Sequence, residues 1–282
     1  MIVLAWAATA RAGPCGRPDL VETFPPSDAT DVPVNARLTA RYVSTAEYLG
    51  EPVSLEHVGV GPEDAPVTFD ANEGLLTIAP VVPLTGGDKY KIGWPALRGL
   101  TTAALGRGAD VTFMAGTGDD QSAPEFAGAL GLAWDIERYD DDCTDSPEDR
   151  YRFDVSIGEA TDDGPRDMLT LVVFQTSGPT QPGGSPEPVF VGHLPERGKV
   201  AEVRRPIDAA IGRICFAALV RDSVGRASNS ADHEVCVTTV RPPFFYGCSL
   251  PPGRGRSWVP IFVVVALGAA WRSRRRPRGL LT

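Results

Sequence analysis

Short runs of alternating apolar and polar residues, each closed by turn residues, recur through most of this chain. Examples are ARLTARYV at 36–43, KYKIGW at 89–94 and RYRFDVSIG at 150–158. Successive side chains of a β-strand point to opposite faces, so this alternation is typical of half-buried strands. Pro, Gly, Asn and Asp bound the runs and favour turns. No long segment keeps a helical period, and the sequence therefore predicts an all-β fold.

The composition agrees with this prediction. The chain has 30 glycines and 26 prolines among 282 residues. Proline removes a backbone donor and glycine weakens helix interiors, so such a composition suits short strands and many turns. Hydrophobic residues make up 43% of the chain, enough to bury a sizeable core.

The spacing of the expected strands predicts two tandem antiparallel β-sandwiches. Six or seven short strands in about 100–120 residues are typical of a sandwich. The alternation stops at GTGDDQSAP, residues 116–124, and resumes after it. This Gly/Asp/Ser-rich stretch has the composition of a linker. We expect one sandwich over 19–117 and a second over 122–241.

The first of these segments resembles a known module. ETFPPSDATDVPVNARLTARY at 22–42 and LLTIAPVVPLTGGDKYKIGW at 75–94 are followed by DVTFMAGT at 110–117. Together they resemble the bacterial Ig-like domain of S-layer-type and other surface proteins. Within this segment the strand period places Leu38, Ala40 and Tyr42 on one face.

The second segment resembles a fibronectin type III-like sandwich. RICFAALVRDSVGRASNSADHEVCVTTV at 213–240 is similar to its last hairpin, and Trp134 would be a core residue. Both resemblances imply a spacer, scaffold or binding module.

The first residues are typical of a signal peptide. An apolar run from Ile2 to Ala8 precedes Ala10-Arg11-Ala12, a small-x-small cleavage pattern. A buried N-terminal strand is the alternative, but Gly13-Pro14 would break it at once. We expect residues 1–12 to be a signal peptide and the rest of the chain to be exported.

The C-terminal residues predict a membrane anchor. Residues 258–271 form an apolar run with Trp258 and Trp271 at its ends, and five arginines follow it. Tryptophan favours the membrane interface and arginine the cytoplasmic side. The run is shorter than the ~20 residues that usually span a bilayer, which snorkelling arginines and a thinned bilayer would offset. We expect a hydrophobic anchor helix at 258–271.

Residues 248–282 resemble a C-terminal sorting tag of the MYXO-CTERM type. A cysteine, Cys248, precedes a Gly/Pro spacer, the hydrophobic run and the arginine cluster. The resemblance implies recognition by a sorting peptidase and display on the cell surface or outer envelope, with Cys248 as the processing or lipid-attachment residue. A plain single-pass anchor is the alternative.

Four cysteines remain in the exported body: Cys15, Cys143, Cys215 and Cys236. An even number in an exported chain predicts two disulfides. Cys215 and Cys236 lie on expected neighbouring strands, and the loop that holds Cys143 should lie at the same end. We therefore expect Cys143 to bond one of those two. Zinc is disfavoured, because no Cys-x-x-Cys pair occurs and the histidines follow no ligand spacing.

The charge of the body excludes nucleic acid as a direct partner. Residues 13–248 hold all 36 acidic residues but only 19 of the 27 basic ones. Such a body repels polyanions and could attract cations.

Two acidic loops are weak candidates for calcium, which prefers six to eight hard oxygen ligands. Their spacing matches no EF-hand, and solvated turns are the alternative. The candidates are Asp140, Asp141, Asp142, Asp145, Asp162 and Asp163. No other cofactor is expected.

The sequence favours a non-catalytic function. It contains no G-x-S-x-G, H-E-x-x-H or P-loop motif. We expect an exported, surface-anchored protein that serves as a display, spacer or interaction module and meets an unidentified envelope or extracellular protein or glycan. One alternative is an adhesion or glycan-binding module, with or without calcium, that has PPFFYG at 242–247 as its aromatic patch. The other is an enzyme of unrecognised type, which would need a cleft of converging acids or a histidine.

Overall fold

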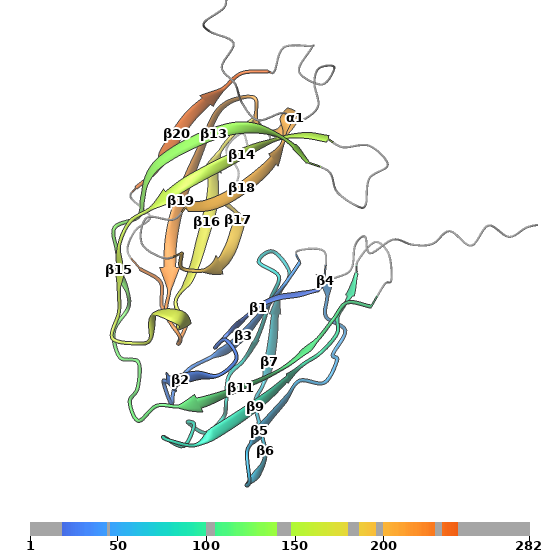
Figure 1. Cartoon of the computed structure of the whole chain (residues 1–282), viewed down its shortest axis with the longest axis vertical. Coiled ribbons are helices and arrows are strands. Elements are labelled where there is room, and N and C mark those ends of the chain that lie inside the picture. Colours follow the sequence, from blue (N-terminus) through green and yellow to red (C-terminus); the bar gives the residue numbers. More distant parts are fainter. Residues whose placement is uncertain are drawn as a thin grey trace, which may run out of the picture. The chain divides into compact units, whose positions relative to one another are not determined.

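The structure, a computed structural model, describes most of the chain between Asp19 and Arg241 (Figure 1). The described residues are 19–43, 46–99, 105–139, 148–179, 186–195, 200–228 and 233–241. The chain up to Arg241 forms one compact unit. Several predicted features lie outside the described residues: the signal peptide at 1–12, Cys15, Cys143, Cys248, PPFFYG and the anchor helix at 258–271.

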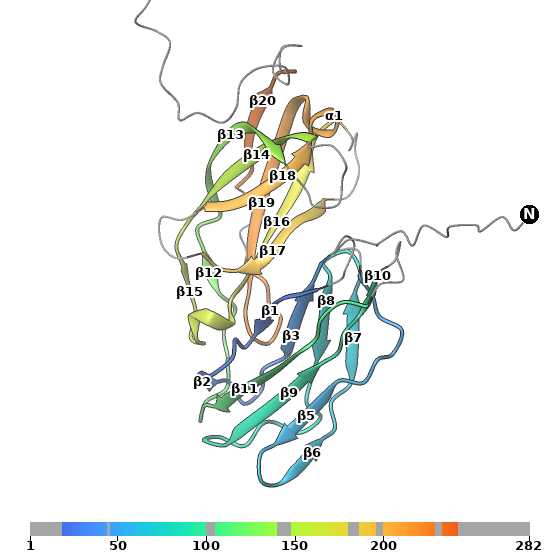
Figure 2. The same ribbon diagram turned by 45° about the vertical axis from the view of Figure 1, so that its right-hand side comes forward.

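Strands from the first half of the described chain form two larger sheets and one small one (Figures 1 and 2). The four-stranded sheet has the order β1 (Leu20–Phe24), β3 (Leu38–Tyr42), β8 (Leu75–Ile78) and β7 (Val67–Asp70). The five-stranded sheet has the order β2 (Ala29–Val32), β11 (Ala109–Ala115), β9 (Lys89–Trp94), β5 (Ser54–His57) and β6 (Gly61–Glu63). The small sheet pairs β10 (Arg98–Gly99) with β4 (Ala46–Glu47).

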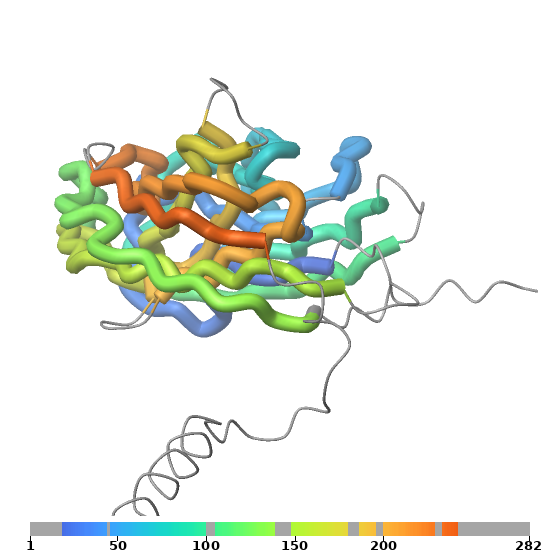
Figure 3. Tube along the Cα trace, turned by 90° about the horizontal axis from the view of Figure 1, so that it is seen from above, coloured from blue at the N-terminus to red at the C-terminus, as the bar shows by residue number. Residues whose placement is uncertain are grey.

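Strands from the second half form separate sheets. The four-stranded sheet has the order β17 (Glu187–His193), β16 (Thr170–Ser177), β19 (Gly212–Arg221) and β20 (Val235–Thr239). The three-stranded sheet has the order β13 (Ala129–Tyr139), β14 (Glu148–Ile157) and β18 (Val200–Pro206). A third sheet pairs β12 (Glu125–Phe126) with β15 (Ala160–Thr161). Figure 3 shows β13 running beside β20.

Helical structure in the described chain is confined to two short segments. A 3₁₀ turn, η1, covers Arg166–Met168, and a one-turn helix, α1, covers Ile207–Ala210. No helix in the described ranges has both the length and the hydropathy to span a membrane. The all-β prediction is confirmed.

The core of the first half lies between its two larger sheets. Leu38, Ala40 and Tyr42 are all buried on one face of β3, as the strand period predicts. Tyr90 and Ile92 of β9 are buried in the same cluster. Alternate residues of each strand point inward, and the apolar side chains at these inward-facing positions build the core.

The core of the second half contains several aromatic side chains. Tyr151 and Phe153 of β14 pack with Phe216 of β19, and the Phe153 and Phe216 ring centroids lie 5.1 Å apart. Trp134 is partly buried against this cluster and meets Tyr151 edge-on, with centroids 5.5 Å apart. Trp134 thus packs against the edge of the core and is not fully buried in it, although the resemblance implied a core residue.

One strand pair departs from the expected antiparallel pattern. β2 runs parallel to β11, with Ala29 opposite Phe113 and Val32 opposite Ala115. The reason is that β1 and β2 belong to different sheets, and the chain crosses between them at Pro25 and Pro26. β2 thereby enters the five-stranded sheet as an edge strand.

In the described ranges, no strand pairs across the stretch 116–124, and each half has its own large buried cluster. Contacts nevertheless join the halves, and the division into two domains at this stretch stays a prediction.

Candidate functional site

The linker stretch 116–124 holds a buried acid, Asp120, which is only 2% exposed. The backbone NH of Asp120 donates to Asn35 Oδ1 at 2.9 Å, and Asn35 Nδ2 donates to the Asp120 carbonyl at 2.8 Å. One amide side chain of the first half thus satisfies both backbone groups of Asp120. This fixes where the linker passes.

A loop of the second half brings further polar groups to Asp120. The loop after β19 supplies Ser223, whose Oγ donates to Asp120 Oδ2 at 2.6 Å. It also supplies Arg226, whose Nη2 donates to Asp120 Oδ1 and whose Nε donates to Asp222 Oδ2 at 2.6 Å. Burial and the nearby charge of Asp222 raise the pKa of Asp120, while Ser223 and Arg226 oppose the shift.

The loop after β19 is shaped by Asp222 itself. Asp222 Oδ1 accepts from the backbone NH of Val224 at 2.9 Å and of Arg226 at 2.7 Å. A short carboxylate side chain that bonds the backbone two to four residues on favours such a turn. The turn folds Arg226 back towards Asp120.

The loop after β15 supplies Asp163, which holds the linker from another direction. Its Oδ1 accepts from Ser122 Oγ at 2.7 Å and from the Ser122 NH at 3.2 Å, and its Oδ2 accepts from the Gln121 NH at 3.0 Å. The hydrogen bond from the Ser122 hydroxyl, and to a smaller extent the one from the Gln121 amide, stabilises the charged carboxylate. These bonds lower the pKa of Asp163 to about 2.

The neighbouring Asp162 has a different environment. Both of its carboxylate oxygens are buried, and neither makes a hydrogen bond to any described residue. The Gly164 backbone amide favours the charged form of this carboxyl group. Burial, followed by the charge of Asp120, raises the pKa of Asp162 to about 6.

One ligand atom from each of Asp120, Asp162 and Asp163 lies within 4.8 Å of the others. We call these three residues the linker acid cluster. The sequence singled out Asp162 and Asp163 as calcium candidates but missed Asp120, because an Asp in a linker looks like ordinary turn chemistry. The other candidates, Asp140, Asp141, Asp142 and Asp145, lie outside the described residues.

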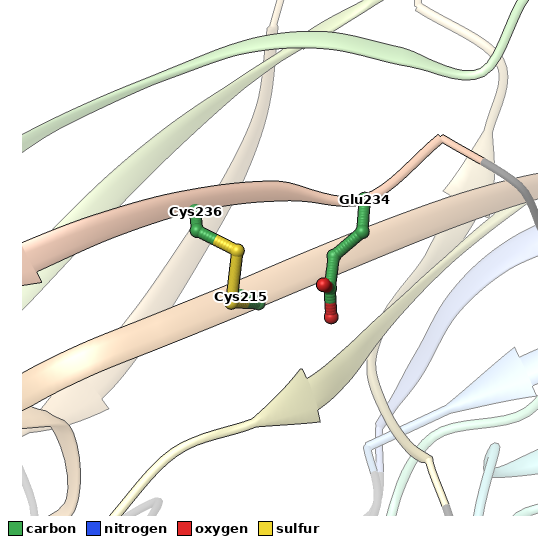
Figure 4. Close-up of side chains that lie close together, drawn as sticks. All are labelled: Cys215, Glu234 and Cys236. Atoms are coloured by element: carbon green, nitrogen blue, oxygen red, sulfur yellow. A yellow bond between two sulfur atoms is a disulfide. The ribbon is translucent and has the colours of Figure 1, made fainter.

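The disulfide expectation needs a correction. Cys215 bonds Cys236, not Cys143 (Figure 4). The two cysteines face each other directly in the β19–β20 ladder, with their Cα atoms 4.1 Å apart. The prediction that they lie on neighbouring strands is confirmed, but the pairing depended on a register that spacing alone does not reveal. Glu234 lies beside them, yet sulfurs joined to each other are not thiolate ligands for a metal.

Two of the histidines have packing roles. His57 is 8% exposed, and its Nε2 lies 2.8 Å from Asp88 Oδ2 and its Nδ1 3.5 Å from Glu63 Oε1. Its ring stacks on Tyr90, with centroids 4.7 Å apart. Both ring nitrogens therefore face carboxylates inside the first half.

His193, at the end of β17, packs against Phe24 of β1, with ring centroids 4.1 Å apart. Its backbone NH donates to Glu22 Oε2 at 3.0 Å. Burial lowers the pKa of His193, although the nearby Glu22 and Asp167 charges oppose the shift. The third histidine, His233, is exposed.

A cavity of about 370 Å³ lies next to the Asp222–Ser223 turn. Phe24, Leu75 and Met168 give it an apolar wall, and Arg37 and Arg221 give it a basic one. Its residues come from strands and loops of both halves, so the cavity belongs to their contact.

Comparisons with known proteins give remote structural likenesses. No protein-family model matches the chain, and no curated protein matches it in sequence. The N-terminal part of the bacterial S-layer protein SbsC aligns with 79% of this chain and 44% of its own, at 11% identity and a TM-score of 0.30. The BSP domain of a biofilm-associated protein aligns with 79% of this chain and 30% of its own, at 12% identity and a TM-score of 0.22.

Fibronectin(III)-like modules of Clostridium thermocellum CbhA align with 77% of this chain and 91% of their own, at 10% identity and a TM-score of 0.24. This chain spans less than half of the SbsC structure. The solved structures it resembles thus include bacterial surface proteins and fibronectin(III)-like modules, and these likenesses assign the chain to no family.

Proposed function

We propose that this chain is an exported, surface-anchored, non-catalytic β-protein that serves as a display, spacer or interaction module of a bacterial envelope. Its anchor would be the hydrophobic run 258–271, and its processing would be carried out by a sorting peptidase acting near Cys248. Its partner would be an envelope or extracellular protein or glycan.

The observation that carries the proposal is the Cys215–Cys236 disulfide. Disulfides persist in oxidising surroundings outside the cytoplasm and are rare within it. This agrees with the two end segments, whose sequences independently predict export and anchoring.

The contacts between the two halves support a spacer role. Arg221 of β19 binds Glu73 in the β7–β8 turn, and the backbone NH of Arg37 donates to the Ser223 carbonyl at 2.7 Å. The Asn35 bonds to Asp120 add a third link at the linker. A spacer needs such links, because free rotation about a linker would lose the position of whatever the chain displays.

The test is to fractionate the producing cells and to map both mature termini of the native protein. We expect a start near Gly13 and an end near Cys248, with the protein on the envelope or in the medium. A matched chain lacking residues 248–282 should be released into the medium. A full-length chain in the cytoplasm with free thiols would contradict the proposal. An intact C-terminus in the membrane fraction would replace the sorting tag with a plain single-pass anchor.

A further inference from the structure

The linker acid cluster concentrates negative charge that its surroundings only partly balance. Asp120 contacts Arg226, as does the neighbouring Asp222. Asp162 and Asp163 contact no basic side chain in the described part of the chain. The side chains of Asp120 and Asp222 are fully buried, so solvent does little to screen them.

The unpartnered carboxylate of Asp162 is the second observation. Asp162 as a residue is half-buried, but both of its carboxylate oxygens are buried, and one of them lies within 4.8 Å of a carboxylate oxygen of Asp120 and of one of Asp163. A buried carboxylate without a donor costs free energy, and such groups in proteins are normally paired or bound to a metal. A positive charge at this point would remove the cost.

Gly164 has no side chain to fill the point beside two of these carboxylate oxygens. A Cβ placed on Gly164 would lie 3.1 Å from Asp162 Oδ2 and 3.2 Å from Asp120 Oδ2. The glycine therefore keeps open a point that is flanked by two carboxylate oxygens. Arg226 reaches Asp120 through the other oxygen, Oδ1, and does not bond Oδ2.

The donor set selects the kind of cation. All three side chains offer hard oxygen atoms, with no nitrogen or sulfur among them. Ca²⁺ accepts six to eight oxygens at 2.3–2.6 Å in flexible arrangements, whereas Mg²⁺ demands a tight octahedron. Three carboxylates from a linker and a loop, with water molecules filling the remaining coordination positions, suit Ca²⁺ better than Mg²⁺.

We propose that Asp120, Asp162 and Asp163 form a Ca²⁺ site that fixes the linker against the second half of the chain. The site goes beyond the proposed function, and its test on the purified chain does not depend on where the protein is located. Calcium sites of extracellular modules have dissociation constants of about 10⁻⁴–10⁻³ M, which is the affinity we expect here.

The test uses the purified full chain, stripped with EDTA, dialysed and titrated with CaCl₂ in a calorimeter and in thermal melts. NaCl at matched ionic strength controls for screening. We expect saturable heat with a dissociation constant of about 0.1–1 mM. We also expect the Tm to rise by about 2–5 °C at saturation.

Two variants locate the site. Asp162→Asn removes a ligand charge and should weaken Ca²⁺ binding at least about tenfold, one carboxylate ligand being lost. Gly164→Ala keeps every charge but fills the flanked point, and it should also abolish the calcium-dependent rise in Tm. Asp64→Asn, an exposed acid of the first half, is the matched control and should bind Ca²⁺ like the parent chain.

Two results would overturn the site: no heat and no change in Tm up to 10 mM CaCl₂, or an Asp162→Asn chain that binds as tightly as the parent. If Asp162→Asn fails to fold, Gly164→Ala decides alone. A negative result in the calcium titration would not change the expected positions of the mature termini. The calcium site and the proposed function can therefore be refuted independently.

Discussion

The guanidinium of Arg221 lies against the carboxylate of Glu73, with Nη2 2.7 Å from Oε1 and Nη1 bonded to Oε2. The Glu73 side chain is only 7% exposed. A turn sets its position: Asp70 Oδ1 accepts from the Asn72 and Glu73 amides, and Gly74 follows with φ of 67°. Two residues 148 positions apart in sequence thus join the halves of the chain.

Glu73→Gln should destabilise the protein by about 1–3 kcal/mol, because Arg221 loses its bidentate ion pair with a carboxylate. Urea unfolding followed by tryptophan fluorescence measures the change. A cycle with Arg221→Met isolates the coupling between the two side chains. A coupling energy near zero would show that the pair does not hold the halves together.

His57→Phe should destabilise the first half by about 0.5–1.5 kcal/mol. The phenyl ring can still stack on Tyr90, but it offers no donor to Asp88 or Glu63. Both carboxylates are partly exposed, so water recovers part of the loss. Thermal melts of this variant and of Val58→Ala, an exposed neighbour, provide the comparison. Equal melting temperatures would contradict the prediction.

Replacing both Cys215 and Cys236 by alanine should cost about 2–4 kcal/mol, because the bond closes a loop between residues 21 positions apart. Urea unfolding without reductant measures the loss, and Cys143→Ala serves as the comparison. Peptide mapping without reduction tests the pairing itself. Trypsin can cut between the two cysteines at Arg221 and Arg226, so the disulfide should join two peptides. Cys143 linked to either residue would refute the pairing.

Acidification should weaken the contact between His193 and Phe24. Burial lowers the folded-state pKa of His193, so the unfolded chain binds more protons as pH falls below about 6.5. The stability that neutral His193 contributes is present above that pH and is lost below it. The Tm of the parent chain should therefore fall more between pH 7.5 and 5 than that of His193→Gln. Parallel curves would exclude this role for His193.

The sequence predicts the strands and cores well, because alternation is a local signal. Leu38, Ala40 and Tyr42 could be placed on one buried face without knowing what covers them. The parallel pairing of β2 with β11 could not be predicted, since it depends on the sheet that the chain joins after Pro25 and Pro26. Local patterns carry no information on that choice.

The candidate site was harder to predict because its members come from three distant segments. Asp162 and Asp163 stood out as an acidic pair, but Asp120 joins them only through the folded linker. Arg226 lies 106 residues from Asp120 in sequence and bonds it directly. Likewise, Cys215 and Cys236 could be placed on adjacent strands, but only the ladder register puts them opposite each other.

The Cys215–Cys236 bond also bears on mechanics. β20 is the last strand of the described fold, so a pull from the C-terminal side would first break the Arg241–Asp208 ion pair and the Tyr151–Val240 hydrogen bond and would then reach Thr239. The strand would then peel from β19 one hydrogen-bonded pair at a time, until it met the cross-link at Cys236. From there the load would pass covalently into β19, the strand that lies between β16 and β20 in its sheet. A tether attached after residue 241 would therefore lengthen by only a few residues before a covalent bond carried its tension.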